Sequence, residues 1–562
     1  MTNDDSRWIL GRRIARGLGV TGAVMLASAL GCASHAPSTP VEATSVPTTA
    51  AAESADVPAD PGPTPPDGQW LTDDQGRQYF VDKLPRAQGT KVDAHTVRTV
   101  WSIPVEITGE DADYWYYKVY RPPEEPVPVT NPQPTAASLA AIEDSYRVEL
   151  PVGKPMPFVD FGRGLPKSGQ WREGFAIADA NGDGHLDLVH GPARKSWGAP
   201  AIFLGDGAGD WKRWKGLSWP GLDYDYGDVA VGDLDGDGHA DLALGVHLRG
   251  LMVLLGDGQG HFRDGGKGLD FTLPSSGFVG FSSRCVTLVD WNGDGRLDLL
   301  ALGEGPRMMG GGGGASKQQV AGAHGVVLYL NLGNGAWKRV DQGTDPRQNF
   351  GAALVLGDFD GDGRNDFAAG TSFLGRRDIV NLAQPDGSWK AEDVPALRRN
   401  GFVNALAAAD LDGTGRSALA VGYLSFEGEE WRTGVDVLRR GTDGLWSRTA
   451  LAVQKTNRGV HSLAFGDLDG DGRADLVGVT DDGSTWVFRG TSSGGFERVA
   501  DAIPRHPEQC RAAHVEVVDL DGDGRGEVVS SFADEVDPGL AGDRRECPSQ
   551  GGLYAWTLAA KP

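Results

Sequence analysis

A nine-residue acidic loop that returns seven times is the feature of this sequence that most constrains its fold. The copy "DLDGDGHAD" is representative, and the others alternate acidic or amide residues with glycine in the same way. The copies begin at Asp179, Asp233, Asp290, Asp358, Asp410, Asp467 and Asp519. Their first aspartates lie 52 to 68 residues apart. Such a period is too long for most helical solenoids and is typical of four-stranded propeller blades.

Each loop sits within the same pattern of apolar runs. A short run such as "GDVAVGD" precedes the loop, a run such as "LALG" follows it, and a third run such as "LMVLLG" ends in a glycine-rich turn. Tight glycine turns between β-rich runs are typical of hairpins. Each repeat therefore predicts four antiparallel strands. The fourth strands begin at an aromatic residue: Trp211, Phe262, Trp337, Trp389, Trp446 and Phe496.

The seventh repeat supplies three strand-like runs, the last being "LYAWTLA". A run without a repeat of its own, "KPMPFVDFGRG", precedes the first loop and carries Phe158 at the aromatic position. A ring of blades has to pair its ends, because an open sheet edge would otherwise remain. We therefore expect residues 156–163 to pair with residues 553–559.

The chemistry of the loops indicates a hard cation. Positions one, three, five and nine carry carboxylate or amide oxygens, and Ca²⁺ takes six to eight oxygen ligands. An EF-hand is excluded, because its position twelve needs a chelating Glu and Leu244 stands there in the second copy. The alternative, polar turns without metal, would leave three or four carboxylates repelling one another. We predict five to six calcium ions.

The fifth copy differs, since Thr414 and Ala418 replace the carboxylates at positions five and nine, and we predict that it is vacant. The seventh copy ends in Glu527, one methylene longer, and is still expected to close. The predicted ligands, with position seven using its backbone carbonyl, are Asp179, Asn181, Asp183, His185, Asp187; Asp233, Asp235, Asp237, His239, Asp241; Asp290, Asn292, Asp294, Arg296, Asp298; Asp358, Asp360, Asp362, Arg364, Asp366; Asp467, Asp469, Asp471, Arg473, Asp475; Asp519, Asp521, Asp523, Arg525 and Glu527.

These loops and runs resemble the FG-GAP/VCBS repeat family, whose best-known members form the seven-bladed propeller of integrin α subunits. The resemblance covers residues 155–562, and the D-x-[DN]-x-D-G-x-x-D loop is its specific part. The Phe-Gly signature survives at Phe350-Gly351 and is otherwise mostly missing. The resemblance implies an all-β, seven-bladed propeller with calcium loops and, commonly, an extracellular binding role.

The composition agrees with metal-binding loops. The seven loops hold 24 carboxylates, and the formal net charge of the whole chain is −24. Six calcium ions would cancel about half of that charge. Nucleic acid is excluded as a partner, because phosphate binding requires a positive face.

The first 31 residues read as an export signal, with a basic start and the apolar run "GVTGAVMLASAL". "ASALGC" resembles a bacterial lipoprotein cleavage site with Cys32 as the lipidated residue; an ordinary secretory signal is the alternative. Arg12-Arg13 leaves Sec and twin-arginine export open. Residues 32–66 are rich in Pro, Ala, Ser and Thr, which predicts an anchored tether. We expect the bacterial envelope, at the outer membrane or cell surface, with the membrane reached through the lipid.

Two smaller parts and a cysteine pair complete the chain. Residues 67–121 predict a small β-rich module of about four strands, and residues 122–154 a Pro-rich linker with a short helix capped by Thr135. Cys510 precedes the inner strand of the seventh repeat, Cys547 lies in a later loop of the same repeat, and the two are expected to form a disulfide, whereas Cys285 is expected to be a buried small hydrophobe.

No catalytic motif is evident: no histidine falls in an H-E-x-x-H spacing and no G-x-S-x-G elbow occurs. We predict a module that binds a glycan or protein ligand; the alternatives are a propeller-type polysaccharide lyase or other carbohydrate-active enzyme, and a purely structural envelope protein. The face opposite the loops gathers groups that suit an anionic or sugar-rich ligand, unless it is only a solvated rim. These are Arg194, Lys195, Trp197, Trp219, Tyr224, Tyr226, Arg284, Arg376, Arg377, Arg398, Arg399 and Arg458.

Overall fold

The computed structural model describes most of the chain from residue 71 onward. The described residues are 71–72, 78–86, 89–91, 96–99, 104–120, 143–148, 150–193, 198–222, 224–247, 249–269, 282–303, 325–340, 351, 353–370, 379–397, 401–427, 430–533, 547 and 549–559. They fall into two compact units, a small sheet within residues 71–120 and a larger body within residues 143–559. The predicted export signal, Cys32 and the tether of residues 32–66 lie outside the described residues.

The small unit is one six-stranded antiparallel sheet with the order β1-β2-β6-β5-β4-β3. Leu84, Ile107 and Trp115 form its buried core. We predicted about four strands; β1 and β3 have only two and three residues, too short to show an alternating pattern. The strands are β1 (Leu71–Thr72), β2 (Gln78–Pro85), β3 (Gly89–Lys91), β4 (Thr96–Thr99), β5 (Pro104–Glu110) and β6 (Tyr114–Tyr120).

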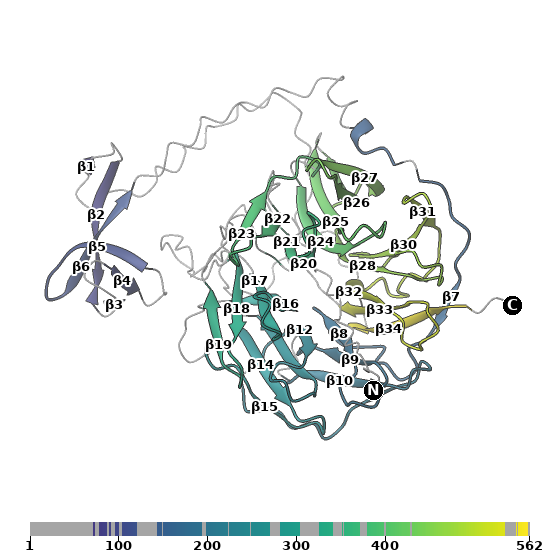
Figure 1. Ribbon diagram of the computed structural model, residues 1–562, viewed down its shortest axis with the longest axis horizontal. Coiled ribbons are helices and arrows are strands. Elements are labelled where there is room, and N and C mark those ends of the chain that lie inside the picture. The colour runs from purple at the N-terminus through teal and green to yellow at the C-terminus, as the bar shows by residue number, and fades with distance from the viewer. Residues whose placement is uncertain are drawn as a thin grey trace, which may run out of the picture. The chain divides into compact units, whose positions relative to one another are not determined.

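The larger unit contains seven antiparallel sheets of four strands each among its described residues, arranged around a ring (Figure 1). This all-β arrangement is propeller-like, as the repeat pattern predicted. From the first sheet to the seventh, consecutive first strands pack beside one another. These inner strands are β8 (Phe175–Ala178), β12 (Gly227–Gly232), β16 (Ser283–Val289), β20 (Leu354–Gly357), β24 (Gly401–Ala409), β28 (Val460–Gly466) and β32 (Arg511–Val518).

The second and third strands form the middle of each sheet. The second strands are β9 (Asp187–His190), β13 (Asp241–Val246), β17 (Asp298–Gly303), β21 (Asp366–Ala369), β25 (Ala418–Glu427), β29 (Asp475–Thr480) and β33 (Glu527–Ala533). The third strands are β10 (Ala201–Gly205), β14 (Gly250–Gly256), β18 (Val326–Asn331), β22 (Val380–Ala383), β26 (Glu430–Arg440), β30 (Thr485–Gly490) and β34 (Gly551–Leu558). Every residue of β13 and β14 is buried, because sheets on both sides cover them.

The fourth strands begin at the predicted aromatic residues. They are β11 (Trp211–Arg213), β15 (Phe262–Asp264), β19 (Trp337–Val340), β23 (Trp389–Glu392), β27 (Trp446–Gln454), β31 (Phe496–Val499) and β7 (Phe158–Asp160). Some of these rings tie one sheet to the preceding one. Trp211 Nε1 donates to the carbonyl of Phe161 at 3.0 Å, and Trp337 Nε1 donates to that of Gly265 at 2.8 Å.

The ring closes through strands from both ends of the unit. β7 pairs antiparallel with β34, with Phe158 opposite Leu558 and Asp160 opposite Trp556. The blue β7 and the yellow β34 therefore lie side by side in Figure 1. The pairing expected between residues 156–163 and 553–559 is confirmed, and no separate fourth strand is needed for the seventh sheet.

The segment before β7 lies against the fifth and sixth sheets. Residues 143–145 are helical, within the predicted short helix, and the Tyr146 hydroxyl lies 2.7 Å from Ser425 Oγ. Val152 forms a parallel bridge with Arg498 at the outer strand of the sixth sheet. In the described part of the chain, no helix is both long and apolar enough to cross a membrane.

The predicted disulfide is present. Cys510 immediately precedes β32, Cys547 precedes β34, and their Cα atoms are 5.2 Å apart. The bond thus ties the inner strand of the closing sheet to the approach of its third strand. Cys285 is 3% exposed and packs in the core as a small apolar residue, as predicted.

Candidate metal centre

The aspartate at position one shapes each acidic loop. In the second copy Asp233 Oδ1 accepts the amides of Gly236 at 2.7 Å and Asp237 at 3.1 Å, while Oδ2 accepts that of Gly238 at 3.0 Å. Gly236 and Gly238 have φ of 81° and 86°, a region that favours glycine. One carboxylate and two glycines therefore fold the loop.

The residue at position nine is buried and bridges the loop to the third strand. Asp241 is fully buried; its Oδ2 accepts the Leu234 amide and its Oδ1 the Gly256 amide, both at 2.7 Å. Sequence reasoning gave this residue only a ligand role. The same carboxylate also holds β14 to the start of the loop, a link between residues 15 positions apart that a local pattern does not reveal.

Position nine is equivalent in the other complete copies. Asp187, Asp298, Asp366 and Asp475 each accept one amide from position two and one from the third strand. Glu527, in the seventh copy, accepts the Leu520 amide at 2.7 Å and the Thr557 hydroxyl at 2.8 Å. The longer side chain reaches a different partner, a side-chain hydroxyl in β34.

Burial at position nine favours the neutral acid. It raises the pKa of Asp241, Asp475 and Glu527 to about 7, and neighbouring loop carboxylates act in the same direction. The backbone donors oppose this effect but do not overcome it. A carboxylate of this kind gains most from a nearby cation, because a cation restores the charged form.

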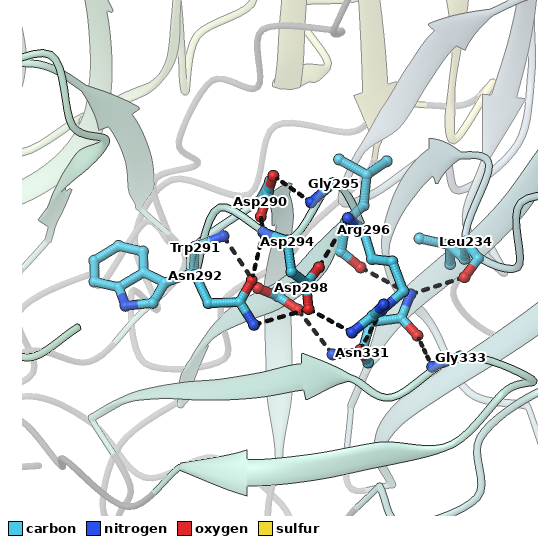
Figure 2. Close-up of polar contacts among 11 residues, drawn as sticks. Leu234, Asp290, Trp291, Asn292, Asp294, Gly295, Arg296, Asp298, Asn331 and Gly333 are labelled. Carbon is cyan, nitrogen blue, oxygen red and sulfur yellow. Dashed lines mark hydrogen bonds and ion pairs between the residues drawn. The ribbon is translucent and has the colours of Figure 1, made fainter. Parts of the chain in front are cut away.

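Positions one, three and nine converge in four copies. One carboxylate oxygen from each residue lies within 4.8 Å of the other two. The groups are Asp233, Asp235, Asp241; Asp358, Asp360, Asp366; Asp467, Asp469, Asp475; and Asp519, Asp521, Glu527. Copies one and three carry the amides of Asn181 and Asn292 at position three. In the third copy, Asn292 Oδ1 accepts the Asp294 amide at 3.0 Å (Figure 2).

An unpaired oxygen in the sixth copy tests whether these residues fit a cation. Asp469 Oδ1 is buried and has no hydrogen-bond partner among the described residues. It belongs to the group of Asp467 and Asp475, whose oxygens lie within 4.8 Å. A buried carboxylate oxygen without a partner is costly, and a hard cation prefers this donor type. The residues therefore fit a calcium ion.

A scan against known families agrees with this geometry. The family model described as FG-GAP-like repeat matches residues 179–244, 320–369 and 467–530, which include five of the acidic loops. The chain therefore carries FG-GAP-like repeats in these three regions. A search of curated proteins found no match. The FG-GAP resemblance drawn from the loops is thus confirmed.

Position five of the FG-GAP loops lies outside the converging groups. Its carboxylate accepts the position-seven amide, as Asp294 does from Arg296 at 3.0 Å. Where position seven is arginine, the guanidinium also pairs with that carboxylate, at Arg296, Arg364, Arg473 and Arg525. The sequence predicted positions five and seven as ligands, position seven through its backbone carbonyl. It did not predict that the two side chains pair with each other.

Hydrogen bonds to backbone carbonyls connect the FG-GAP loops with neighbouring repeats. Asn331 Nδ2, at the end of β18, donates to the Leu234 carbonyl in the second loop at 2.7 Å (Figure 2). The Gly526 amide in the seventh loop donates to the Asp467 carbonyl in the sixth at 2.6 Å. Ordering of one loop therefore supports the next.

The predicted ligand face is only partly described. Tyr226, which precedes β12, stacks on His247 at 4.4 Å, and Arg458 precedes β28. Trp219 stacks on Phe262 at 4.4 Å. The remaining members, Arg194, Lys195, Trp197, Arg376, Arg377, Arg398 and Arg399, lie outside the described residues.

Two members differ from the prediction because they are buried. Tyr224 is 9% exposed, packs in the core between the first two sheets and donates to the Pro220 carbonyl. Arg284 is 7% exposed and pairs with Glu173 at 3.2 Å. The sequence around Tyr224 and Arg284 contains no pattern that predicts burial of these two side chains.

Proposed function

We propose that this protein with FG-GAP-like repeats is a seven-bladed, calcium-binding propeller that acts as a binding module for a glycan or protein ligand. The observation that carries the calcium proposal is the repeated convergence of positions one, three and nine, with Asp469 Oδ1 left unpaired in one copy. Six loops retain an acid at position nine, and the fifth, with Ala418, does not. We expect five to six ions.

Calcium in these loops would neutralise buried acids and fasten the loop to its sheet. Position nine already contacts the third strand through backbone donors, as Asp475 does with Gly490 at 2.7 Å. An ion shared by Asp467, Asp469 and Asp475 would connect the inner strand, the loop and the second strand. The proposed role of the metal is therefore structural, and it keeps the ring rigid for binding.

The proposed binding face is the one opposite the calcium loops. The loops follow the ends of the first strands, whereas Tyr226 and Arg458 precede their starts. Basic and aromatic groups on that side support a ligand with charged or hydroxyl groups. We further propose attachment to the bacterial envelope through a lipid on Cys32, which rests on the "ASALGC" motif alone.

Two measurements test the proposal. Calcium titration of the chelator-treated protein by calorimetry should show five to six sites, and added calcium should raise the melting temperature. A titration without heat of binding and without a change in the melting temperature contradicts calcium binding. Full-length protein is then used to capture material from envelope extract, with and without chelator. A retained glycan or protein supports the binding role. Polysaccharide consumed in the presence of the protein indicates the enzymatic alternative instead.

A further inference from the structure

The seam of the ring lies at β7, which joins the first and seventh sheets. β7 pairs with β34 through three residue pairs. In the other sheets of the ring the fourth strand follows its third strand directly in the chain, whereas β7 and β34 stand at opposite ends of the unit. A hairpin turn therefore cannot support this pairing, and its closure spans nearly the whole ring. The closing strand needs another element to hold it in place.

The chain before β7 is held on the fifth sheet by ion pairs. Glu143 Oε1 pairs with Arg432 Nη2 and lies 3.2 Å from Lys455 Nζ. Glu430 Oε2, in β26, lies 3.0 Å from Arg432 Nη2 and 2.9 Å from Lys455 Nζ. Arg432 is buried, so its charge requires carboxylate partners. Glu143 supplies one of these partners from outside the sheet.

Tyr146 packs the same segment against the fifth sheet. The residue is 5% exposed, and its hydroxyl lies 2.7 Å from Ser425 Oγ. The centre of its ring lies 6.3 Å from that of Tyr423, and the Arg432 guanidinium lies 4.9 Å from it. A buried tyrosine with a paired hydroxyl combines apolar burial with a specific hydrogen bond. The Tyr146 contacts therefore fix the position of this segment on the sheet.

The next residues bind the outer edge of the sixth sheet through their backbone. The Gly153 amide donates to the Arg498 carbonyl at 2.8 Å, and the Arg498 amide donates to the Pro151 carbonyl at 2.9 Å. Arg498 belongs to β31, the fourth strand of that sheet. Leu150 packs against the core that the fifth and sixth sheets share. The segment before β7 is therefore bound to two sheets that lie on one side of the seam.

We propose that residues 143–148 and 150–153 form a latch that keeps the ring closed at β7. Four residues separate Gly153 from Phe158, so the docked latch holds β7 close to β34 and raises the effective concentration of the closing strand. On the other side of β7, Phe161 packs with residues of the first and seventh sheets. Because the latch precedes β7 in the chain, a pull from the N-terminal side reaches the latch first. Release of the latch is the first step of ring opening, whatever ligand the protein binds.

Hydrogen exchange of the full-length protein in calcium-containing buffer, followed by mass spectrometry, tests the latch. The Ala559 amide donates to the Pro157 carbonyl and the Phe161 amide to the Ala555 carbonyl, both at 2.8 Å, so these two amides report on the closing strand. We expect Tyr146→Ala to speed their exchange about tenfold or more, because β7 loses the segment that holds it in place. The amides of β13 and β14, far from the seam in the chain, should exchange as in wild type.

A charge-matched pair of variants tests the ionic end of the latch. Glu143→Gln removes the ion pairs with Arg432 and Lys455 and should speed exchange of the same two amides about twofold to fivefold, since exposed ion pairs contribute little. Asp144→Asn is the control. It removes the same charge from the adjacent exposed residue, whose side chain forms no ion pair with either sheet among the described residues. This variant should exchange like wild type.

Three results would overturn the proposal. Unchanged exchange at Ala559 and Phe161 in Tyr146→Ala would show that β7 stays in the ring without the latch. An equal rise in β13 and β14 would show that Tyr146 stabilises the whole body and not the closing strand. If Asp144→Asn speeds exchange as much as Glu143→Gln, the effect comes from net charge, and the ion pairs of Glu143 do not hold the latch.

Discussion

A comparison of the fifth and sixth loops shows which residues give an FG-GAP loop its shape and which further residue the proposed metal site requires. Asp410 Oδ1 accepts the Gly413 amide at 2.9 Å, and Asp467 Oδ1 accepts the Gly470 amide at 2.8 Å, so both loops turn in the same way. The sixth loop adds Asp475 at position nine, where the fifth has Ala418. Loop shape therefore needs only position one and the glycines, whereas chelation needs position nine.

The two sheets differ in how they hold the third strand. Asp475 links the sixth loop to Gly490 in β30. The fifth sheet lacks this link but has β25 and β26 of 10 and 11 residues, whose pairing extends from Leu419 to Glu427. A longer hairpin thus takes the place of the link that a buried carboxylate supplies in the sixth sheet.

Removal of calcium should produce the largest effect. If six sites are held at ten times their dissociation constants, linkage gives about 1.4 kcal/mol per site and about 8 kcal/mol in total. We expect chelation to lower the melting temperature by many degrees and added calcium to restore it. Native mass spectrometry should count five to six ions and not seven. An unchanged melt after exhaustive chelation contradicts the claim.

Loss of one position-nine acid should come next. Asp475→Ala removes a ligand and leaves the Leu468 and Gly490 amides without their partner, which we expect to cost about 2–4 kcal/mol. Denaturant unfolding in calcium measures this cost. Thr414→Ala in the fifth loop is the control and should stay within about 0.5 kcal/mol. Equal costs for the two variants would show that the loops do not differ in metal content.

Completion of the fifth loop should give a smaller gain. The double change Thr414→Asp and Ala418→Asp restores the side-chain set of the sixth loop, and we expect one calcium ion more than in wild type, with about 1.4 kcal/mol of added stability at ten times its dissociation constant. Without calcium the variant should be less stable than wild type, because Ala418 is 4% exposed and the new acid is buried. A variant that binds no more ions than wild type contradicts the ligand assignment.

The smallest effect concerns pH in the calcium-free protein. Burial raises the pKa of Asp475 from 3.8 to about 7, so the fold favours its protonated form. That contribution is complete below about pH 4 and is lost as pH rises through about 7. Chelated protein should therefore melt lower at pH 8 than at pH 5, and Asp475→Asn should weaken this dependence. The fifth loop, with Ala418, should contribute nothing.

The sequence predicted the elements that depend on local pattern. Repeat length, the four-strand order, the aromatic starts such as Trp211 and the closing strand at Phe158 all follow from apolar runs and glycine turns. The position-nine bridges, the bulge at Asn404 and the inward Tyr224 depend on residues distant in sequence. Tertiary packing decides these features, and no spacing within one repeat encodes them.

The pairing of β7 with β34 has a consequence for the order in which the chain folds. Each of the other sheets joins strands that are close in sequence, so it can form soon after its own repeat is synthesised. The closing sheet instead joins Phe158 to Leu558, and β7 must wait for nearly the whole chain. We expect ring closure to be the slow final step of folding, and truncation within β34 to trap an open intermediate with two unpaired edges.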